Sequence, residues 1–263
     1  MECNDHKLII VIAIVLSIFT SACAATTERE EPFTETEELH VAAASSLRFA
    51  FEEIGGIFEA EKDIRVVFQF GSSGNLAHQI ASGAPVDLFA SANKNFIDHL
   101  VDNGDILQES TALYAIGRVV LAVNIQSQLE ILSLEDLISD EIDYISIANP
   151  SHAPYGLAAK EVLESKGLWS LVEDKLVYGE TVSQALQFVQ TGNAPVGIIA
   201  LSYADVPEIE YFLVDEALHT PLEHILGVVS HSQQQMLAME FAEFITSLQG
   251  REIMEKHGFY LPE

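Results

Sequence analysis

Apolar and polar residues follow two different rhythms along most of the chain. Short apolar runs, several of them rich in β-branched residues, predict strands at 39–44, 64–70, 86–91, 118–124, 144–149, 196–201 and 224–230. Between them, apolar residues at helical spacing predict helices at 46–62, 73–83, 93–104, 155–167, 181–192 and 233–258. In the first helix, for example, Leu47, Phe51, Ile54 and Phe58 fall on one face. Strands that alternate with helices predict an α/β fold with largely parallel sheets.

Small, hydroxylic or proline residues stand at several junctions between a predicted strand and the next helix. The junctions read "AAASSL", "FGSSGN", "NPSHAPYG" and "YGETVSQ". The first N–H groups of a helix lack intrahelical acceptors and carry the positive end of the helix dipole, so such a junction can bind an anion without Lys or Arg. The alternative is ordinary helix capping, which stabilises a helix by about 1 kcal/mol with no ligand. Composition alone leaves both interpretations open.

The first residues have the pattern of an export signal. The apolar block 8–19 is short for a membrane-spanning helix, and the small residues of "TSACAA" follow it, so we expect a signal peptide at 1–23. "TSAC" resembles a lipobox that would make Cys23 the lipidated first residue, although cleavage at an A-x-A site would release a free protein. The acidic, core-less segment 24–38 is expected to be a linker.

Charge and cysteine content limit the partners and the chemistry. The chain has 12 Lys+Arg against 40 Asp+Glu, a formal net charge of −28. This excess of acid argues against nucleic acid or an anionic membrane surface as a partner. Cys3 and Cys23 are the only cysteines and both lie in the export signal, so the remaining chain has no disulfide or thiolate chemistry.

Two other classes of function fit the sequence less well than an anion receptor. An exported serine hydrolase is disfavoured because "GSSGN" departs from the G-x-S-x-G pattern at Asn75. A receptor for a metal ion could use His219, His224 and His231, but their spacing matches no ligand motif. We therefore expect no enzyme activity, no cofactor and no directly bound metal cation.

Four longer segments carry a family resemblance. "AAASSLRFAFEEIGGIFEAEK", "FGSSGNLAHQIASGAPVDLFASANKNFIDHLVDNGDI", "ANPSHAPYGLAAKEVLESKG" and "GETVSQALQFVQTGNAPVGII" resemble the molybdate-binding proteins of bacterial ABC importers. The resemblance runs in order from about residue 39 to the final "MEKHGFYLP". It implies a two-lobed type II periplasmic-binding-protein fold, with a hinge and with the oxyanion enclosed between the lobes.

The resemblance also implies which residues bind the anion. Two serines of strand-to-helix turns match Ser46 and Ser73, which would offer hydroxyl and backbone N–H groups. Two positions that donate a backbone N–H at helix starts match Tyr155 and Val182.

A fifth family position departs from the pattern. The family often has a tyrosine hydroxyl there, but this chain has Ala200, which offers no side-chain donor. We hypothesise that the phenol of Tyr155 replaces it, with the phenol of Tyr203 as the alternative.

The resemblance completes the expected organisation and role. Lobe 1 is expected at 39–115 with a return segment at 226–263, and lobe 2 at 116–225. The ligand would be molybdate or tungstate, delivered to the membrane permease of an ABC importer by an extracytoplasmic monomer, anchored through lipid at Cys23 or free. The runner-up is a receptor for another tetrahedral oxyanion such as tungstate or sulfate.

Overall fold

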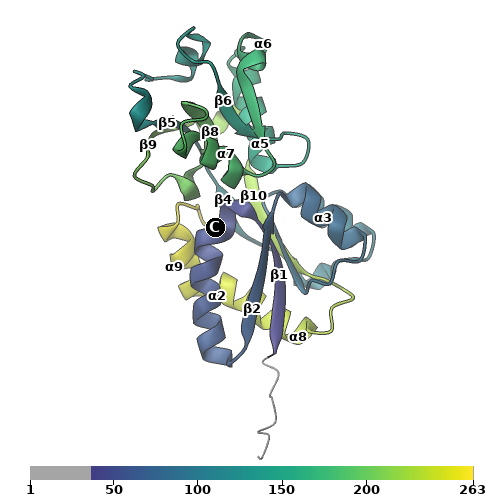
Figure 1. Cartoon of the computed structure of the whole chain (residues 1–263). Helices are drawn as coiled ribbons and strands as arrows, with labels where there is room; N and C mark the ends of the chain where they lie inside the picture. Colours follow the sequence, from purple (N-terminus) through teal and green to yellow (C-terminus); the bar gives the residue numbers. More distant parts are fainter. Residues whose placement is uncertain (1–36, 263) are drawn as a thin grey trace, which may run out of the picture. The chain divides into compact units, whose positions relative to one another are not determined.

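In the computed structural model, which describes residues 37–262, the strands form two separate sheets (Figure 1). The first sheet has the order β2-β1-β3-β10-β4, formed by β1 (Glu38–Ala44), β2 (Arg65–Gly71), β3 (Leu88–Ser91), β4 (Ala112–Gly117) and β10 (Leu222–Val228). The second has the order β7-β6-β8-β5-β9, formed by β5 (Val119–Asn124), β6 (Ile145–Ala148), β7 (Leu176–Gly179), β8 (Val196–Ala200) and β9 (Ile209–Leu213).

The two sheets share one pattern of strand directions. In the first sheet β2, β1 and β3 are parallel, and β10 runs antiparallel to both β3 and β4. In the second, β7, β6 and β8 are parallel, and β5 runs antiparallel to both β8 and β9. Each sheet is therefore mixed but has a single reversed strand, which agrees with the largely parallel sheets that the sequence predicted. Because the parallel strands of each sheet point the same way, their carboxyl ends and the helix starts that follow lie at one edge.

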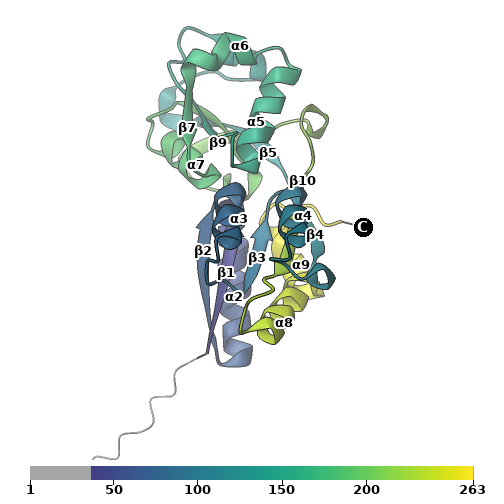
Figure 2. The ribbon, with the colours of Figure 1, turned by 90° about the vertical axis from the view of Figure 1, so that its right-hand side faces the viewer.

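Helices cover both faces of the first sheet. α2 (Arg48–Lys62), α8 (Gln235–Thr246) and α9 (Leu248–Lys256) pack together on one face, while α3 (Ser73–Ala81) and α4 (Lys94–Asp102) pack on the other (Figures 1 and 2). The apolar stripe predicted for the first helix is buried, with Phe51 and Phe58 packed against Phe241 of α8. Burying each of these rings contributes about 2–3 kcal/mol.

The second sheet is covered by α5 (Pro154–Ser165) and α7 (Val182–Gln190), with the short α6 (Trp169–Val172) beside α5. Two short 3₁₀ helices matter for the site: η1 (Ser45–Leu47), which precedes α2, and η6 (Leu201–Tyr203), which follows β8. The closing helices predicted within 233–258 are α8 and α9, divided at Ser247, where the backbone is extended and the hydroxyl caps α9 by accepting from Gly250 N. The strands β4, β7 and β9 were not predicted; β7 and β9 are partly or mostly exposed and so lack a continuous apolar run.

The chain passes between the sheets at two places (Figure 2). β4 and β5 are separated by Arg118 alone yet belong to different sheets, and the return passage lies between β9 and β10. The lobe boundary expected at 115/116 falls inside β4, and the one expected at 225/226 falls inside β10. Apolar periodicity does not show at which residue the chain changes sheet.

The expected signal peptide, the linker up to Thr36 and the Cys23 site lie outside the described residues. Between residues 37 and 262, no helix combines the length and the apolar character that crossing a bilayer requires.

Candidate functional site

Four helix starts surround one small cavity between the two sheets. Its lining is made of small, hydroxylic and apolar residues: Ala44, Ser45, Ser46, Gly71, Ser72, Ser73, Ala92, Ala153, Pro154, Tyr155 and Val182. All four candidate ligands, Ser46, Ser73, Tyr155 and Val182, are in this set. Within the described part of the chain no charged side chain lines the cavity. The structure thus brings the predicted residues together, while their binding of an anion stays a prediction.

The four starts come from both lobes. Ser46 lies in η1 after β1, and Ser73 is the first residue of α3 after β2. Tyr155 is the second residue of α5, and Val182 is the first residue of α7. Backbone N–H groups at these first-turn positions have no acceptor within their own helix. The cavity is therefore faced by uncharged donors backed by helix dipoles.

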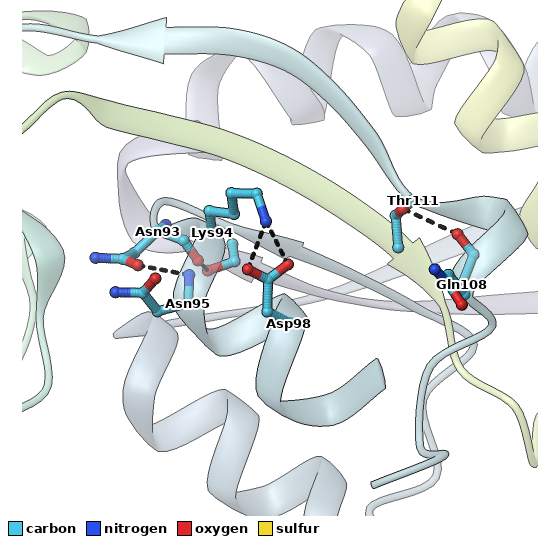
Figure 3. Close-up of polar contacts among 7 residues, drawn as sticks. Asn93, Lys94, Asn95, Asp98, Gln108 and Thr111 are labelled. Carbon is cyan, nitrogen blue, oxygen red and sulfur yellow. Dashed lines mark hydrogen bonds and ion pairs between the residues drawn. The ribbon is translucent and has the colours of Figure 1, made fainter. Parts of the chain in front are cut away.

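Helix capping explains these junctions less well than the sequence suggested. In α3 and α5 no side chain accepts a hydrogen bond from the first turn, whereas Thr181 does so for α7. α4, whose N-cap is not part of the cavity lining, has a regular cap: Asn93 Oδ1 accepts from Asn95 N at 2.8 Å (Figure 3). Without such a cap, the N–H groups of Ser73 in α3 and of Tyr155 in α5 stay available to a ligand, whereas Gly74 N of α3 donates to a backbone carbonyl, His152 O.

The hydroxyl of Ser73 is oriented by its neighbour strand. Ser73 Oγ accepts a hydrogen bond from Ala92 N at 3.0 Å. Since a lone pair of the oxygen is used in this way, the hydroxyl hydrogen is free to turn into the cavity. The side chain is fully buried, so this donor is held in place without competition from bulk water.

A contact between the lobes depends on a glycine. Gly74 N donates to His152 O at 3.0 Å, and a Cβ at position 74 would lie only 2.8 Å from that oxygen. His152 Nδ1 is also 2.9 Å from Ser72 Oγ, and its Nε2 is 3.4 Å from Glu180, whose side chain is 71% exposed. These bonds join the start of α3 in one lobe to the loop before α5 in the other.

Behind Ser46 lies a buried polar cluster that sequence analysis missed. Ser46 Oγ is 3.2 Å from His224 Nε2, and His224 Nδ1 is 3.0 Å from the carbonyl oxygen of Leu222. His224 is fully buried on β10, and burial lowers the pKa of its imidazole to about 4. The imidazole is therefore neutral at neutral pH. The sequence had marked His224 only as a possible metal ligand, because its proximity to Ser46 depends on the pairing of β10 with β3 and β4.

The phenol of Tyr155 points into the same cluster. Its hydroxyl is buried and has no hydrogen-bond partner among the described residues. A Cβ at position 117 would lie 2.2 Å from this oxygen, so only glycine leaves room for it. Burial raises the pKa of Tyr155, and the Ser46 hydroxyl nearby lowers it in part. The phenol stays protonated and is an unpaired donor beside Ser46.

Tyr203, the alternative donor, is already engaged. Its hydroxyl donates to the carbonyl oxygen of Ser45, and Ser202 Oγ donates to Ser46 O at 2.8 Å. η6 of the second lobe thus holds η1 of the first. Ala200 is buried at the end of β8, paired with Val119, and is not part of the cavity lining.

The two serine–histidine contacts do not make a hydrolytic site. His224 Nδ1 faces a carbonyl where a triad has a carboxylate, and its low pKa makes it a weak base. In the Ser72–His152 pair, the carboxylate of Glu180 faces Nε2 and is largely exposed. Among residues 37–262, no group of three or more His, Cys, Asp or Glu residues is placed to hold a metal ion.

Comparisons with known proteins agree on one family. Residues 39–260 match the family model described as bacterial extracellular solute-binding protein. YvgL of Bacillus subtilis (strain 168), whose name assigns it to the substrate-binding lipoproteins of ABC transporters, is 33% identical over 95% of this chain and 96% of its own length. The molybdate-binding protein ModA of Rhodobacter capsulatus is 30% identical over 84% of this chain and 88% of its own length. The solved periplasmic molybdate-binding protein of Azotobacter vinelandii is 27% identical, with a TM-score of 0.79 over 86% of this chain and all of that chain. The fold of that structure confirms the two-lobed architecture expected from the sequence.

Proposed function

Because the chain belongs to the family of bacterial extracellular solute-binding proteins, we propose that it captures molybdate outside the cytoplasm and delivers it to an ABC importer. The observation that carries the proposal is the cavity itself: Ser46, Ser73, Tyr155 and Val182 converge from four helix starts, with no charged side chain of the described residues in the lining. Its relatives with about 30% identity are named for binding molybdate.

A lining rich in N–H and O–H donors and without a carboxylate suits the ligand's chemistry. Molybdate at neutral pH is a dianion whose four oxygens only accept hydrogen bonds, so N–H and O–H donors can satisfy all of them. Hydrogen phosphate keeps one O–H that needs an acceptor, and leaving that group unpaired costs about 1–3 kcal/mol. Sulfate makes the same hydrogen-bond demands as molybdate and would be rejected by its smaller size. Tungstate, almost equal in size to molybdate, should bind comparably.

Tyr155 supplies the donor that Ala200 lacks. Its phenol is protonated, buried, unpaired and next to Ser46, whereas the hydroxyl of Tyr203 is bonded to the Ser45 carbonyl. We therefore assign four residues to binding of the anion. Ser46 and Ser73 carry hydroxyl groups, Val182 binds through its backbone N–H, and Tyr155 binds through both its backbone N–H and its phenol.

The decisive experiment is calorimetric titration of the purified protein with molybdate, tungstate, sulfate and phosphate. We expect tight binding of molybdate and tungstate and none of phosphate. Sulfate bound as tightly as molybdate would replace the proposal with the runner-up, a general receptor for tetrahedral oxyanions.

A matched pair of variants tests the site. Ser73→Ala removes a buried donor to a charged ligand and should weaken binding by about 10- to 100-fold. Ser82→Ala, at the exposed far end of the same helix, should leave the affinity unchanged. Equal affinities for the two variants would place the ligand elsewhere.

The membrane partners follow from the family. We propose that the protein is anchored through lipid on Cys23, as the lipoprotein name of its relative YvgL suggests, and that it meets the importer's permease as a monomer. Mass spectrometry of the mature N-terminus checks the anchor. An unmodified start after Cys23 would show that the protein is released.

A further inference from the structure

The carbonyl of Leu222 fixes the tautomer of His224. A carbonyl oxygen only accepts, so the 3.0 Å contact requires the hydrogen to be on Nδ1. In the neutral ring Nε2 then has a lone pair and no hydrogen. Ser46 Oγ lies 3.2 Å from Nε2, so the Ser46 hydroxyl donates its hydrogen to His224.

This direction of the hydrogen bond works against an anion. With its hydrogen directed at His224, the side chain of Ser46 offers only oxygen lone pairs toward the cavity, and these repel an oxyanion. The bond reverses only when Nε2 also bears a hydrogen, which requires an imidazolium. Nε2–H then donates to Ser46 Oγ, and the Ser46 hydrogen becomes free to donate to the ligand.

The surroundings of His224 leave it sensitive to a charge in the cavity. The ring is faced by Tyr114 of β4, Tyr155 of α5, Ser46 of η1 and Phe259 after α9. Both phenols are protonated, since burial raises the pKa of each tyrosine. In this dry environment the two negative charges of an oxyanion, one hydroxyl away, strongly favour a positive imidazolium.

Two charged residues adjoin this cluster along the chain, Arg118 directly after β4 and Glu223 directly before His224, and both are directed elsewhere. The Arg118 guanidinium lies 4.4 Å from the centre of the Tyr260 ring and pairs with Glu216 at 2.9 Å. Glu223 precedes His224 on β10 and points to the opposite face of the sheet. The shift in the pKa of His224 accordingly comes from burial, opposed only by the Leu222 carbonyl.

We propose that His224 is a positioning residue that couples oxyanion capture to the uptake of a proton from solvent. The proton goes to Nε2, the Ser46 hydroxyl turns toward the ligand, and the buried site gains one positive charge against the ligand's two negative ones. This inference rests on the proposed function. It adds that the protein binds its ligand more tightly as pH falls toward mild acidity, by up to about tenfold per pH unit.

The test is calorimetric titration of the protein with sodium molybdate at about pH 6.5, in buffers that differ in their ionisation enthalpy. The slope of the observed heat against that enthalpy gives the number of protons taken up. We expect a clear uptake, approaching one proton, for the wild type and for His78→Gln, which changes an exposed histidine of α3. We expect none for His224→Gln, whose affinity should be lower and independent of pH.

The outcomes separate the two proposals. Tight binding with heat that does not depend on the buffer overturns the proton coupling and leaves molybdate capture standing. Absence of molybdate binding by the wild type overturns both. If His224→Gln fails to fold, the ¹⁵N resonances of His224 in the wild type decide: they must change from the neutral to the doubly protonated pattern on adding molybdate, and an unchanged pattern refutes the coupling.

Discussion

Replacing Tyr155 by Phe should stabilise the free protein and weaken its ligand binding at the same time. The substitution removes one oxygen and keeps the ring that packs near His224 and Gly117. In the free protein that oxygen is a buried hydroxyl without a partner among the described residues. In the complex we expect it to donate to the anion. Its loss should therefore stabilise the free protein and destabilise the complex.

The magnitudes follow from the burial of the hydroxyl. A buried polar group without a partner costs about 1–3 kcal/mol, and the small void left by the oxygen returns part of this. We expect a net gain of about 1 kcal/mol in the free energy of unfolding, which raises the melting temperature by about 2–4 °C in a domain of this size. A hydrogen bond to a charged ligand contributes about 1.5–3 kcal/mol, so binding should weaken by about 10- to 150-fold.

Two assays on the same sample test the two expected changes. Thermal unfolding without ligand measures the gain in stability, and calorimetric titration with molybdate measures the loss of affinity. Tyr114→Phe is the matched control, since its hydroxyl is also buried and unpaired within residues 37–262 but Tyr114 does not line the cavity. This variant should gain similar stability and keep its affinity. A Tyr155→Phe protein with wild-type affinity would refute the reasoning, because the phenol would then not reach the ligand.

Three further predictions test the surroundings of the site. The pKa of His224 is lowered from 6.5 to about 4, so between these pH values the unfolded chain binds a proton that the folded chain does not. The ligand-free protein should therefore lose about 3 kcal/mol of unfolding free energy as the pH falls from 6.5 to 4. Urea unfolding measures this loss, which should be smaller for His224→Gln. Gly117→Ala places a Cβ 2.2 Å from the Tyr155 hydroxyl oxygen and should weaken molybdate binding about as much as Tyr155→Phe, with a stability loss of about 1–3 kcal/mol; unchanged affinity in the titration would contradict the assigned geometry. Gly56→Ala, exposed in the middle of α2 with open space around its Cβ, should raise stability by about 0.5–1 kcal/mol and leave binding unchanged, as thermal unfolding and titration would show.

The sequence by itself determined the local elements and made an anion one of two interpretations of the helix starts. The apolar stripe of α2, for example, needs only a spacing along one helix, and Phe51 and Phe58 are buried as that spacing predicts. The small and hydroxylic residues before helix starts indicated an anion site, because the N–H groups of a first helical turn depend on the local backbone alone. The resemblance then selected Ser46, Ser73, Tyr155 and Val182, which line one cavity.

Only the tertiary structure decided which buried groups contact those four residues. His224 is 178 positions from Ser46, and Gly117 meets the Tyr155 phenol across two lobes. Such contacts depend on strand pairing and on where the chain crosses between sheets, and neither leaves a periodic signal in the sequence. The direction of the Ser46 hydrogen bond likewise depends on the backbone carbonyl of Leu222. Because every residue type has a backbone carbonyl, the sequence gives no sign of this contact. Periodicity along the chain reports what each segment buries, whereas the proton balance of the site is set by atoms that meet only after the segments have packed.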